Sequence, residues 1–175
     1  MAAQTRSGDL NPGDRGDRGS AIALVVNGTK HEVAMPGGSS LLSALRDELK
    51  LKGTRIGCEE ERCGACTVLV EGAPVHSCRT PVELVAEKAV TTIEGLAGES
   101  VGADLVHLFL EEQAAQCGYC TNGLIVGIAG LLRRDPAPTR AEVLSFLDER
   151  HLCRCGAHPR ILKVIDRVLA RSETR

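Results

Sequence analysis

The residues of this chain best suited to chemistry are its eight cysteines, which fall into two sets of four. In the first set, four residues separate Cys58 from Cys63, and two separate Cys63 from Cys66. Cys78 completes the set after eleven further residues. Thiolates bind soft metals, and this spacing is typical of the ligands of a [2Fe–2S] cluster.

Glycines around the first set support the same interpretation. Three thiolates on one loop reach a small inorganic core only if the loop curls tightly, and Gly57 and Gly64 allow that curl. They also let backbone N–H groups approach the sulfurs. A zinc site and two disulfides are the alternatives, but zinc knuckles favour two separated cysteine pairs over three cysteines within nine residues.

The second set consists of two close pairs, Cys117 with Cys120 and Cys153 with Cys155, which 32 residues separate. Pairs of this kind also suit zinc. Each pair, however, lies just before or at the start of a predicted helix, where N–H groups and the helix dipole stabilise an anionic thiolate cluster. Arg154 adds positive charge nearby. We interpret this set as the ligands of a second [2Fe–2S] cluster, with zinc as the alternative.

Other polar residues near the cysteines form weaker patterns. Cys155 and His158 make half of a Rieske motif, but the sequence has no matching half. The remaining histidines have no partner spacing and are expected on the surface or at helix caps; they are His31, His76, His107 and His151. The acidic run 59–61 is expected to be a solvated face, with a docking patch for a redox partner as the alternative.

The elements that must position the first set are expected to be strands. Residues 21–34 form two strand-like runs around Asn27 and Gly28, which is a strong hairpin signal. Ser39 is the expected N-cap of a helix that continues to about residue 50. Residues 67–78 predict a second hairpin that turns at 71–74, and residues 89–96 predict a closing strand.

Beyond about residue 97 the apolar residues follow a helical period, and four helices are expected. A break at 135–138 separates the second helix from the third, for which Thr139 is the expected N-cap. The prediction is therefore an α+β chain. It has a disordered tail over 1–20, a β-rich half over 21–96, a linker over 97–102 and a helical half over 103–175.

Composition excludes several classes of protein. The 21 basic and 23 acidic side chains give a net charge of -2, which argues against a protein that coats nucleic acid. No apolar run approaches the roughly 18 residues of a membrane helix, so no membrane span is predicted. The N-terminal residues show no export signal, and a cytoplasmic location is expected, where thiols stay reduced or bind metal.

Three motifs together resemble the iron–sulfur subunit of the molybdenum hydroxylases, the xanthine oxidase family. They read IGCEEERCGACTVLVEGAPVHSC, then QCGYCTNG, then LCRCGAHPRI, and the resemblance covers roughly residues 22–172. It implies a β-grasp domain of the plant-type ferredoxin kind followed by a four-helix domain, each with one [2Fe–2S] cluster. It also implies a subunit that performs no substrate chemistry and passes on electrons from a large subunit that holds the molybdopterin cofactor.

The resemblance also implies residue roles. The cysteines at 58, 63, 66 and 78 match the ligands of the cluster farther from molybdenum, and those at 117, 120, 153 and 155 match the ligands of the nearer cluster. Gln116 matches the glutamine whose amide contacts the pterin, and Cys155 matches the ligand whose sulfur lies closest to it. Two positions depart from the family pattern: Asn122 stands where many relatives have proline, and Glu61 stands where many have glycine.

The segment CRCGAHPRI is closest in style to nicotinate and isoquinoline dehydrogenase small subunits. That similarity implies oxidation of an N-heteroaromatic compound such as nicotinate, with the electrons passing to a c-type cytochrome or an FAD subunit. The same relay role in an aldehyde- or carbon monoxide-oxidising enzyme is the alternative, and a zinc-binding interaction module is a remote one. Export together with a partner subunit, or membrane association through one, is the alternative to a cytoplasmic location.

Overall fold

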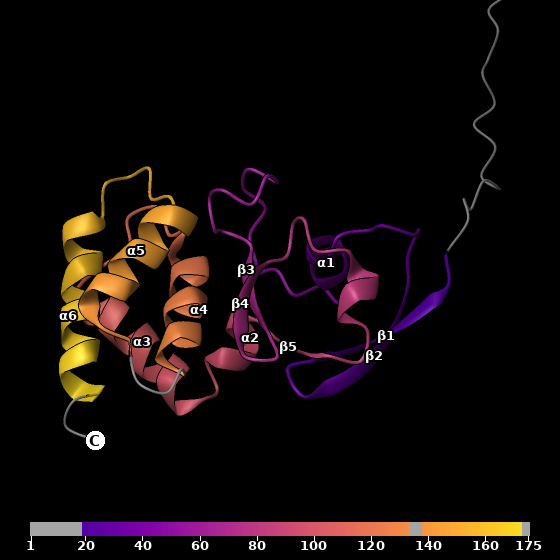
Figure 1. Ribbon diagram of the computed structural model, residues 1–175, viewed down its shortest axis with the longest axis horizontal. Helices are drawn as coiled ribbons and strands as arrows, with labels where there is room; N and C mark the ends of the chain where they lie inside the picture. The colour runs from indigo at the N-terminus through magenta and orange to yellow at the C-terminus, as the bar shows by residue number, and fades with distance from the viewer. Residues whose placement is uncertain (1–18, 134–137, 173–175) are drawn as a thin grey trace, which may run out of the picture.

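A small mixed sheet and a group of helices lie side by side along the long axis of the molecule (Figure 1). The computed structural model describes residues 19–133 and 138–172. The predicted tail therefore lies outside the described residues except for its last two positions, and so does most of the predicted break at 135–138.

The sheet has five strands in the order β2-β1-β5-β3-β4. Strand β1 (Ala21–Val26) pairs antiparallel with β2 (Thr29–Ala34). Strands β3 (Thr67–Val70) and β4 (Ala73–His76) form the second predicted hairpin. Strand β5 (Ala89–Thr91) lies parallel to β1 and antiparallel to β3, and so joins the two hairpins.

Both hairpins turn through pairs of residues with positive φ. Asn27 and Gly28 have φ angles of 51° and 77°, and Glu71 and Gly72 have 50° and 80°. Two-residue turns with positive φ match the right-handed twist of the flanking strands, which explains why the Asn-Gly signal predicts its hairpin. The second turn is made by Glu71 and Gly72 and is shorter than the predicted 71–74.

Short helical segments cover the sheet. Helix α1 (Leu41–Ser43) continues into the wider turn η1 (Ala44–Glu48), and η2 (Val82–Val85) follows β4. Their apolar residues join those of the strands in one core, which includes Leu24, Leu41, Leu45, Val68, Val82 and Val90. The predicted Ser39 cap is wrong by one residue, because the Ser40 side chain accepts the N–H of Ser43.

The predicted strand over 89–96 is also wrong in its second half. Only Ala89–Thr91 pairs with the sheet, and Ile93–Leu96 forms the short helix α2. The reason is that Leu96 is fully buried in the core of the helical half, whereas Val90 belongs to the core of the sheet.

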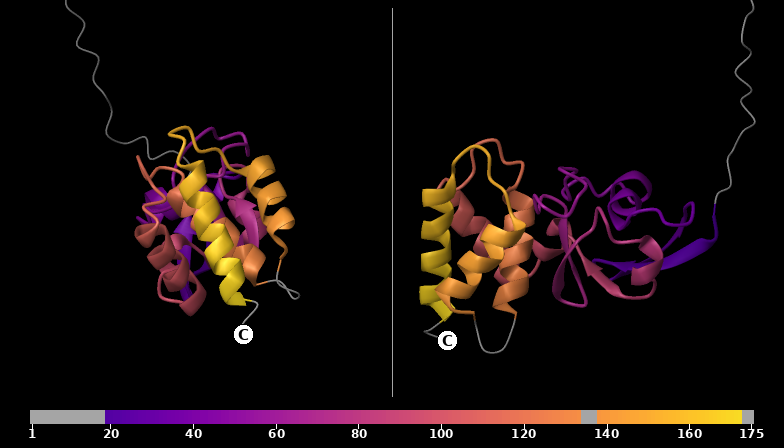
Figure 2. Two further views of the ribbon diagram at one scale, coloured as in Figure 1. Left: turned by 90° about the vertical axis from the view of Figure 1, so that its left-hand side faces the viewer. Right: turned by 45° about the horizontal axis from the view of Figure 1, so that its top comes forward.

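The described part of the helical half contains four longer helices, as predicted. They are α3 (Ser100–Glu111), α4 (Thr121–Leu132), α5 (Arg140–Arg150) and α6 (His158–Ser172), grouped around a shared core (Figure 2). Thr139 caps α5 as predicted, in a capping box with Glu142. Helix α3 begins three residues earlier than predicted, inside the expected linker 97–102. None of the described helices is long and apolar enough to cross a bilayer.

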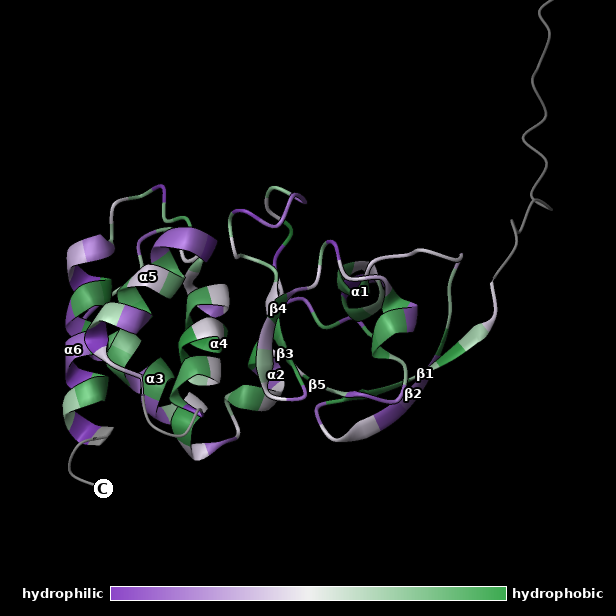
Figure 3. Cartoon of the chain, viewed as in Figure 1, coloured by the Kyte–Doolittle hydropathy of each residue, from purple (hydrophilic) through white to green (hydrophobic). Residues whose placement is uncertain are grey.

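Helix α4 attaches the helical half to the sheet, and Figure 3 shows how apolar it is. Its Gly130 lies against Leu69 of β3 and Pro74 of β4, so that a Cβ at Gly130 would come within 2.8 Å of both side chains. At the other end of α4, the amide of Asn122 donates to the carbonyl of Gly53 at 2.9 Å. Gly130 lets α4 approach the β3–β4 hairpin closely, and Cys66 and Cys78 of the first set lie just before and just after this hairpin.

Candidate metal centres

The loop of the first cysteine set wraps its own backbone around the sulfurs. The Sγ of Cys58 accepts the N–H groups of Glu60, Arg62 and Cys63 at 3.3–3.4 Å. The N–H of Cys58 in turn donates to the Sγ of Cys63 at 3.3 Å. A Cβ at Gly57 would lie 2.3 Å from that Sγ, so the predicted need for glycine here has a direct cause.

These N–H groups stabilise negative charge on the sulfurs. Burial raises the pKa of Cys58, but the backbone N–H groups of Glu60, Arg62 and Cys63 outweigh it and lower the pKa to about 7. Cys66 behaves differently, because burial and the neighbouring Cys78 raise its pKa to about 12. The first set therefore has one thiolate, Cys58, that the backbone stabilises, and one buried thiol, Cys66, that needs a nearby cation to ionise.

The second set lies where the sequence predicts, at the start of α4 and in the loop before α6. Cys120 is the N-cap residue of α4, and burial together with Cys153 raises its pKa to about 12. Cys117 and Cys155 are exposed, and their sulfurs are 3.1 Å apart. The N–H of Tyr119 lowers the pKa of Cys117.

The eight sulfurs are arranged as four pairs. In the described part of the chain, no group of three or more His, Cys, Asp or Glu side chains is placed to hold one metal ion. Hydrogen bonds instead link the cysteines two by two, and the pairs are 58 with 63, 66 with 78, 117 with 155 and 120 with 153. None of the eight forms a disulfide. Two pairs in each set fit a [2Fe–2S] cluster, in which two cysteines bind each iron.

Both sets open onto one hollow of about 320 Å³. Five of the eight cysteines line it, at positions 58, 63, 117, 120 and 155, together with Tyr119, Leu152 and Arg154. The backbone also connects the sets directly, because the N–H of Leu152 donates to the carbonyl of Cys63 at 3.1 Å. Leu152 precedes Cys153, so one hydrogen bond joins ligand loops of the two sets.

Comparison with known proteins supports this arrangement. Residues 24–97 match the 2Fe-2S iron-sulfur cluster binding domain family, and residues 92–166 match the [2Fe-2S] binding domain family. A nicotinate dehydrogenase subunit of Pseudomonas putida is 40% identical over 156 residues, which are 89% of this chain and 97% of that protein. The alpha subunit of isoquinoline 1-oxidoreductase of Brevundimonas diminuta is 42% identical over 147 residues, 83% of this chain and 95% of that protein.

A solved structure has the same fold. Quinoline 2-oxidoreductase from Pseudomonas putida 86 superposes with a TM-score of 0.77 at 34% identity, covering 85% of this chain and 91% of that one. The chain belongs to the iron–sulfur subunits of the molybdenum hydroxylase family. The predicted α+β architecture is confirmed, and the protein is a non-catalytic iron–sulfur subunit of an oxidoreductase.

In this iron–sulfur subunit the two residues assigned to a pterin contact are accessible. Gln116 is exposed in the loop between α3 and α4, directly before the exposed Cys117. Cys155 is also exposed and touches Cys117 through its sulfur. The second set thus has an open side at Gln116, Cys117 and Cys155, whereas Cys153 is buried.

The acidic run 59–61 is exposed, as predicted. Its backbone conformation gives a reason why glycine suits the position of Glu61, where many relatives are expected to have it. Glu59 and Glu61 have φ angles of 57° and 59°, in the left-handed region that favours glycine. The alternative role of this run as a docking patch stays a prediction.

We predict that Glu61→Gly stabilises the loop by about 1 kcal/mol, because a side chain in the left-handed region costs roughly that much. Thermal unfolding of the metal-loaded protein measures the change. Glu60→Gly is the matched control, because Glu60 lies outside the residues with positive φ, and it should lower the stability instead. An unchanged or lower unfolding temperature for Glu61→Gly would contradict the prediction.

Two of the histidines are more enclosed than predicted. His76 at the end of β4 is buried, and burial lowers its pKa, so the expectation of a surface or cap position is wrong for it. His151 is the C-cap residue of α5, which agrees with the predicted cap position. Its ring is nevertheless enclosed, and burial lowers its pKa to about 4. The two rings lie edge to face, with centroids 6.3 Å apart. By contrast, His107 is exposed beside Glu111 on α3.

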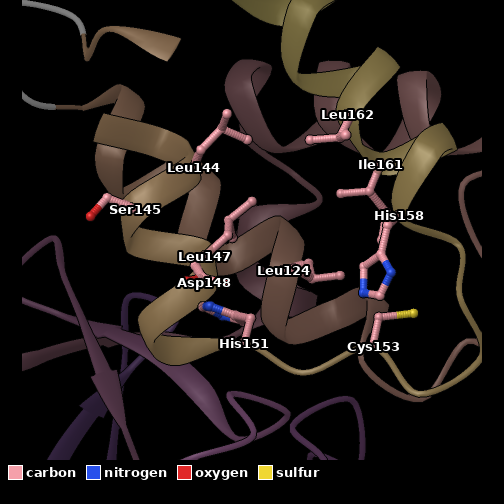
Figure 4. A pocket seen from close by; sticks show the side chains of 10 residues that line it. All are labelled: Leu124, Leu144, Ser145, Leu147, Asp148, His151, Cys153, His158, Ile161 and Leu162. Carbon is pink, nitrogen blue, oxygen red and sulfur yellow. The ribbon is translucent and has the colours of Figure 1, made fainter. Parts of the chain in front are cut away.

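A second hollow of about 430 Å³ lies between α5 and α6 (Figure 4). Leucine and isoleucine make up half of the residues that line it, with His151, Cys153 and His158 at one end. Cys153, a buried ligand candidate of the second set, lies at this end of the hollow.

Proposed function

We propose that this subunit relays electrons through two [2Fe–2S] clusters, one bound by the cysteines at 58, 63, 66 and 78 and the other by those at 117, 120, 153 and 155. The observation that carries the proposal is the arrangement of the eight sulfurs as two sets of two pairs, with members of both sets lining one hollow. Each bound cluster accepts and releases one electron at a time.

The chain itself contributes position, shielding and charge stabilisation. Cys66, Cys78 and Cys153 are buried, so water is kept from at least one ligand of each cluster. The N–H groups of the 58–63 loop compensate negative charge on its sulfurs, as the N-terminal end of α4 does for the second set.

The open side of the second set gives the relay a direction. We propose that Gln116, Cys117 and Cys155 face a large subunit that holds the molybdopterin cofactor, with the Gln116 amide in contact with the pterin. Their exposure in this chain supports that contact. Electrons would enter at the helical half and leave through the first set. The division of the chain into domains at 21–96 and 103–175 remains our prediction.

For the substrate we propose an N-heteroaromatic compound such as nicotinate. The support is that similar proteins are named nicotinate dehydrogenase and isoquinoline 1-oxidoreductase subunits. The proposed acceptor is a c-type cytochrome or an FAD subunit. We propose a cytoplasmic location, which suits eight reduced thiols; the alternative is co-export through a partner subunit.

The proposal is tested by purifying the intact complex without air and adding nicotinate. We expect the visible absorption of the clusters to bleach and to recover when cytochrome c or the FAD subunit is supplied. Bleaching by an aldehyde or by carbon monoxide alone would assign the relay to the alternative enzymes. A colourless protein that contains zinc in place of iron would contradict the relay altogether.

A further inference from the structure

His151 occupies the junction between the two cysteine sets. It follows the last residue of α5, where its backbone N–H donates to the carbonyl of Leu147 at 2.9 Å. The next peptide N–H, from Leu152, donates to the carbonyl of Cys63 in the first set. The residue after that is Cys153 of the second set. The backbone of His151 is therefore hydrogen-bonded to α5 directly before Leu152, whose N–H connects the two cysteine loops.

The imidazole of His151 joins the two halves of the chain. Its Nε2 lies 3.1 Å from the carbonyl of Gly123 on α4 and 3.3 Å from the hydroxyl of Thr67 on β3. The Thr67 hydroxyl donates its proton to the carbonyl of Gly64 at 2.7 Å, so it accepts from the histidine. Nε2 thus carries the proton and donates to both halves, and the buried Nδ1 has no hydrogen-bond partner among the described residues.

The surroundings of the ring are shaped to its size. A Cβ at Gly64 would come within 2.4 Å of the ring's Cδ2, and a Cβ at Gly127 within 2.8 Å of its Cε1. Phe146 lies against the ring from α5, with centroids 5.3 Å apart. Gly64 belongs to the first cysteine loop and Gly127 to α4, so the ring fills a space that both halves leave for it.

We propose that His151 is a positioning residue that fixes the separation and orientation of the two cluster sites and thereby sets the electron transfer between them. The inference rests on the proposed relay function. Electron tunnelling weakens steeply with distance, so a small displacement of the Cys63 loop relative to the Cys153 loop changes the rate. His151 acts through the Leu152–Cys63 hydrogen bond and is not itself a cluster ligand.

The test compares wild type, His151→Ala, His151→Gln and the control His107→Ala in the intact, reduced complex. The readouts are iron content, the magnetic splitting between the reduced clusters in the EPR spectrum, and the rate of inter-cluster electron transfer by stopped flow. We expect His151→Ala to retain its iron but to change the splitting and slow the transfer. His151→Gln, which can donate through its amide, should retain wild-type values, as should His107→Ala.

A wild-type splitting and rate in iron-loaded His151→Ala would overturn the inference, and so would a His151→Gln variant that behaves like alanine. If His151→Ala loses iron, Gly127→Ala tests the same contact, because the added methyl displaces the ring without replacing the histidine. We then expect a changed splitting, and an unchanged one would overturn the inference. Wild-type protein without iron would instead refute the proposed function.

Discussion

Replacing Cys153 with serine is expected to remove one of the two clusters and to abolish electron transfer through the subunit. Cys153 is buried and paired with Cys120 at the start of α4, which places its sulfur beside a second predicted ligand. A serine hydroxyl is a much poorer ligand for iron in a sulfur site. The iron content should fall from about four to about two atoms per chain, with one EPR signal lost.

The control for this variant is Arg154→Ser, which changes an exposed neighbour of the same loop that is no predicted ligand. It should keep both EPR signals, although its lost positive charge can alter a reduction potential. Two intact signals in Cys153→Ser, or a loss of both, would contradict the assignment of Cys153 to one separate cluster.

The second large effect is expected from Gly123→Ala, which should separate the two halves of the chain. A Cβ at Gly123 would lie 2.1 Å from the carbonyl oxygen of Gly64 and 3.1 Å from the Cα of Ala65. The obstacle is backbone and cannot rotate away, so α4 must move off the cysteine loop. We expect the free energy of unfolding to fall by about 3 kcal/mol, at the upper end of the usual cost of overpacking.

Denaturant unfolding of the metal-loaded protein measures this loss, and the hydrogen bond from His151 to the Gly123 carbonyl should be lost with it. Gly37→Ala is the matched control, because a Cβ at Gly37 meets no atom of residues 19–133 and 138–172 within 4 Å. Equal stabilities for the two alanine variants would show that α4 does not depend on close approach at Gly123.

The sequence predicted those features that depend on neighbouring residues. The spacing of the cysteines, the Asn27–Gly28 turn and the Thr139 cap each arise within a short stretch, and each is present in the structure. The long helices were predictable because a helical period repeated over several turns is a strong signal. Prediction was weaker where a segment is short, as at Ser40 and at Ile93–Leu96, because packing there decides between competing structures.

Contacts between the halves could not be predicted in this way. His76 has no motif around it, and its burial depends on its place at the end of β4 beside His151, which is 75 positions later in the sequence. Gly123, Gly127 and Gly130 recur along one apolar helix, which is a signal for close approach, but the pattern does not name the partner. Only the fold shows that the partners are Gly64, His151 and the β3–β4 hairpin.

The most direct test of the central claim is the iron and acid-labile sulfide content of the intact complex prepared without air, measured together with its reduced EPR spectrum. We predict about four iron and about four sulfide per chain and two distinct signals, one for each cysteine set. Fewer than about four iron atoms, a single signal, or cysteines recovered as disulfides would contradict the account.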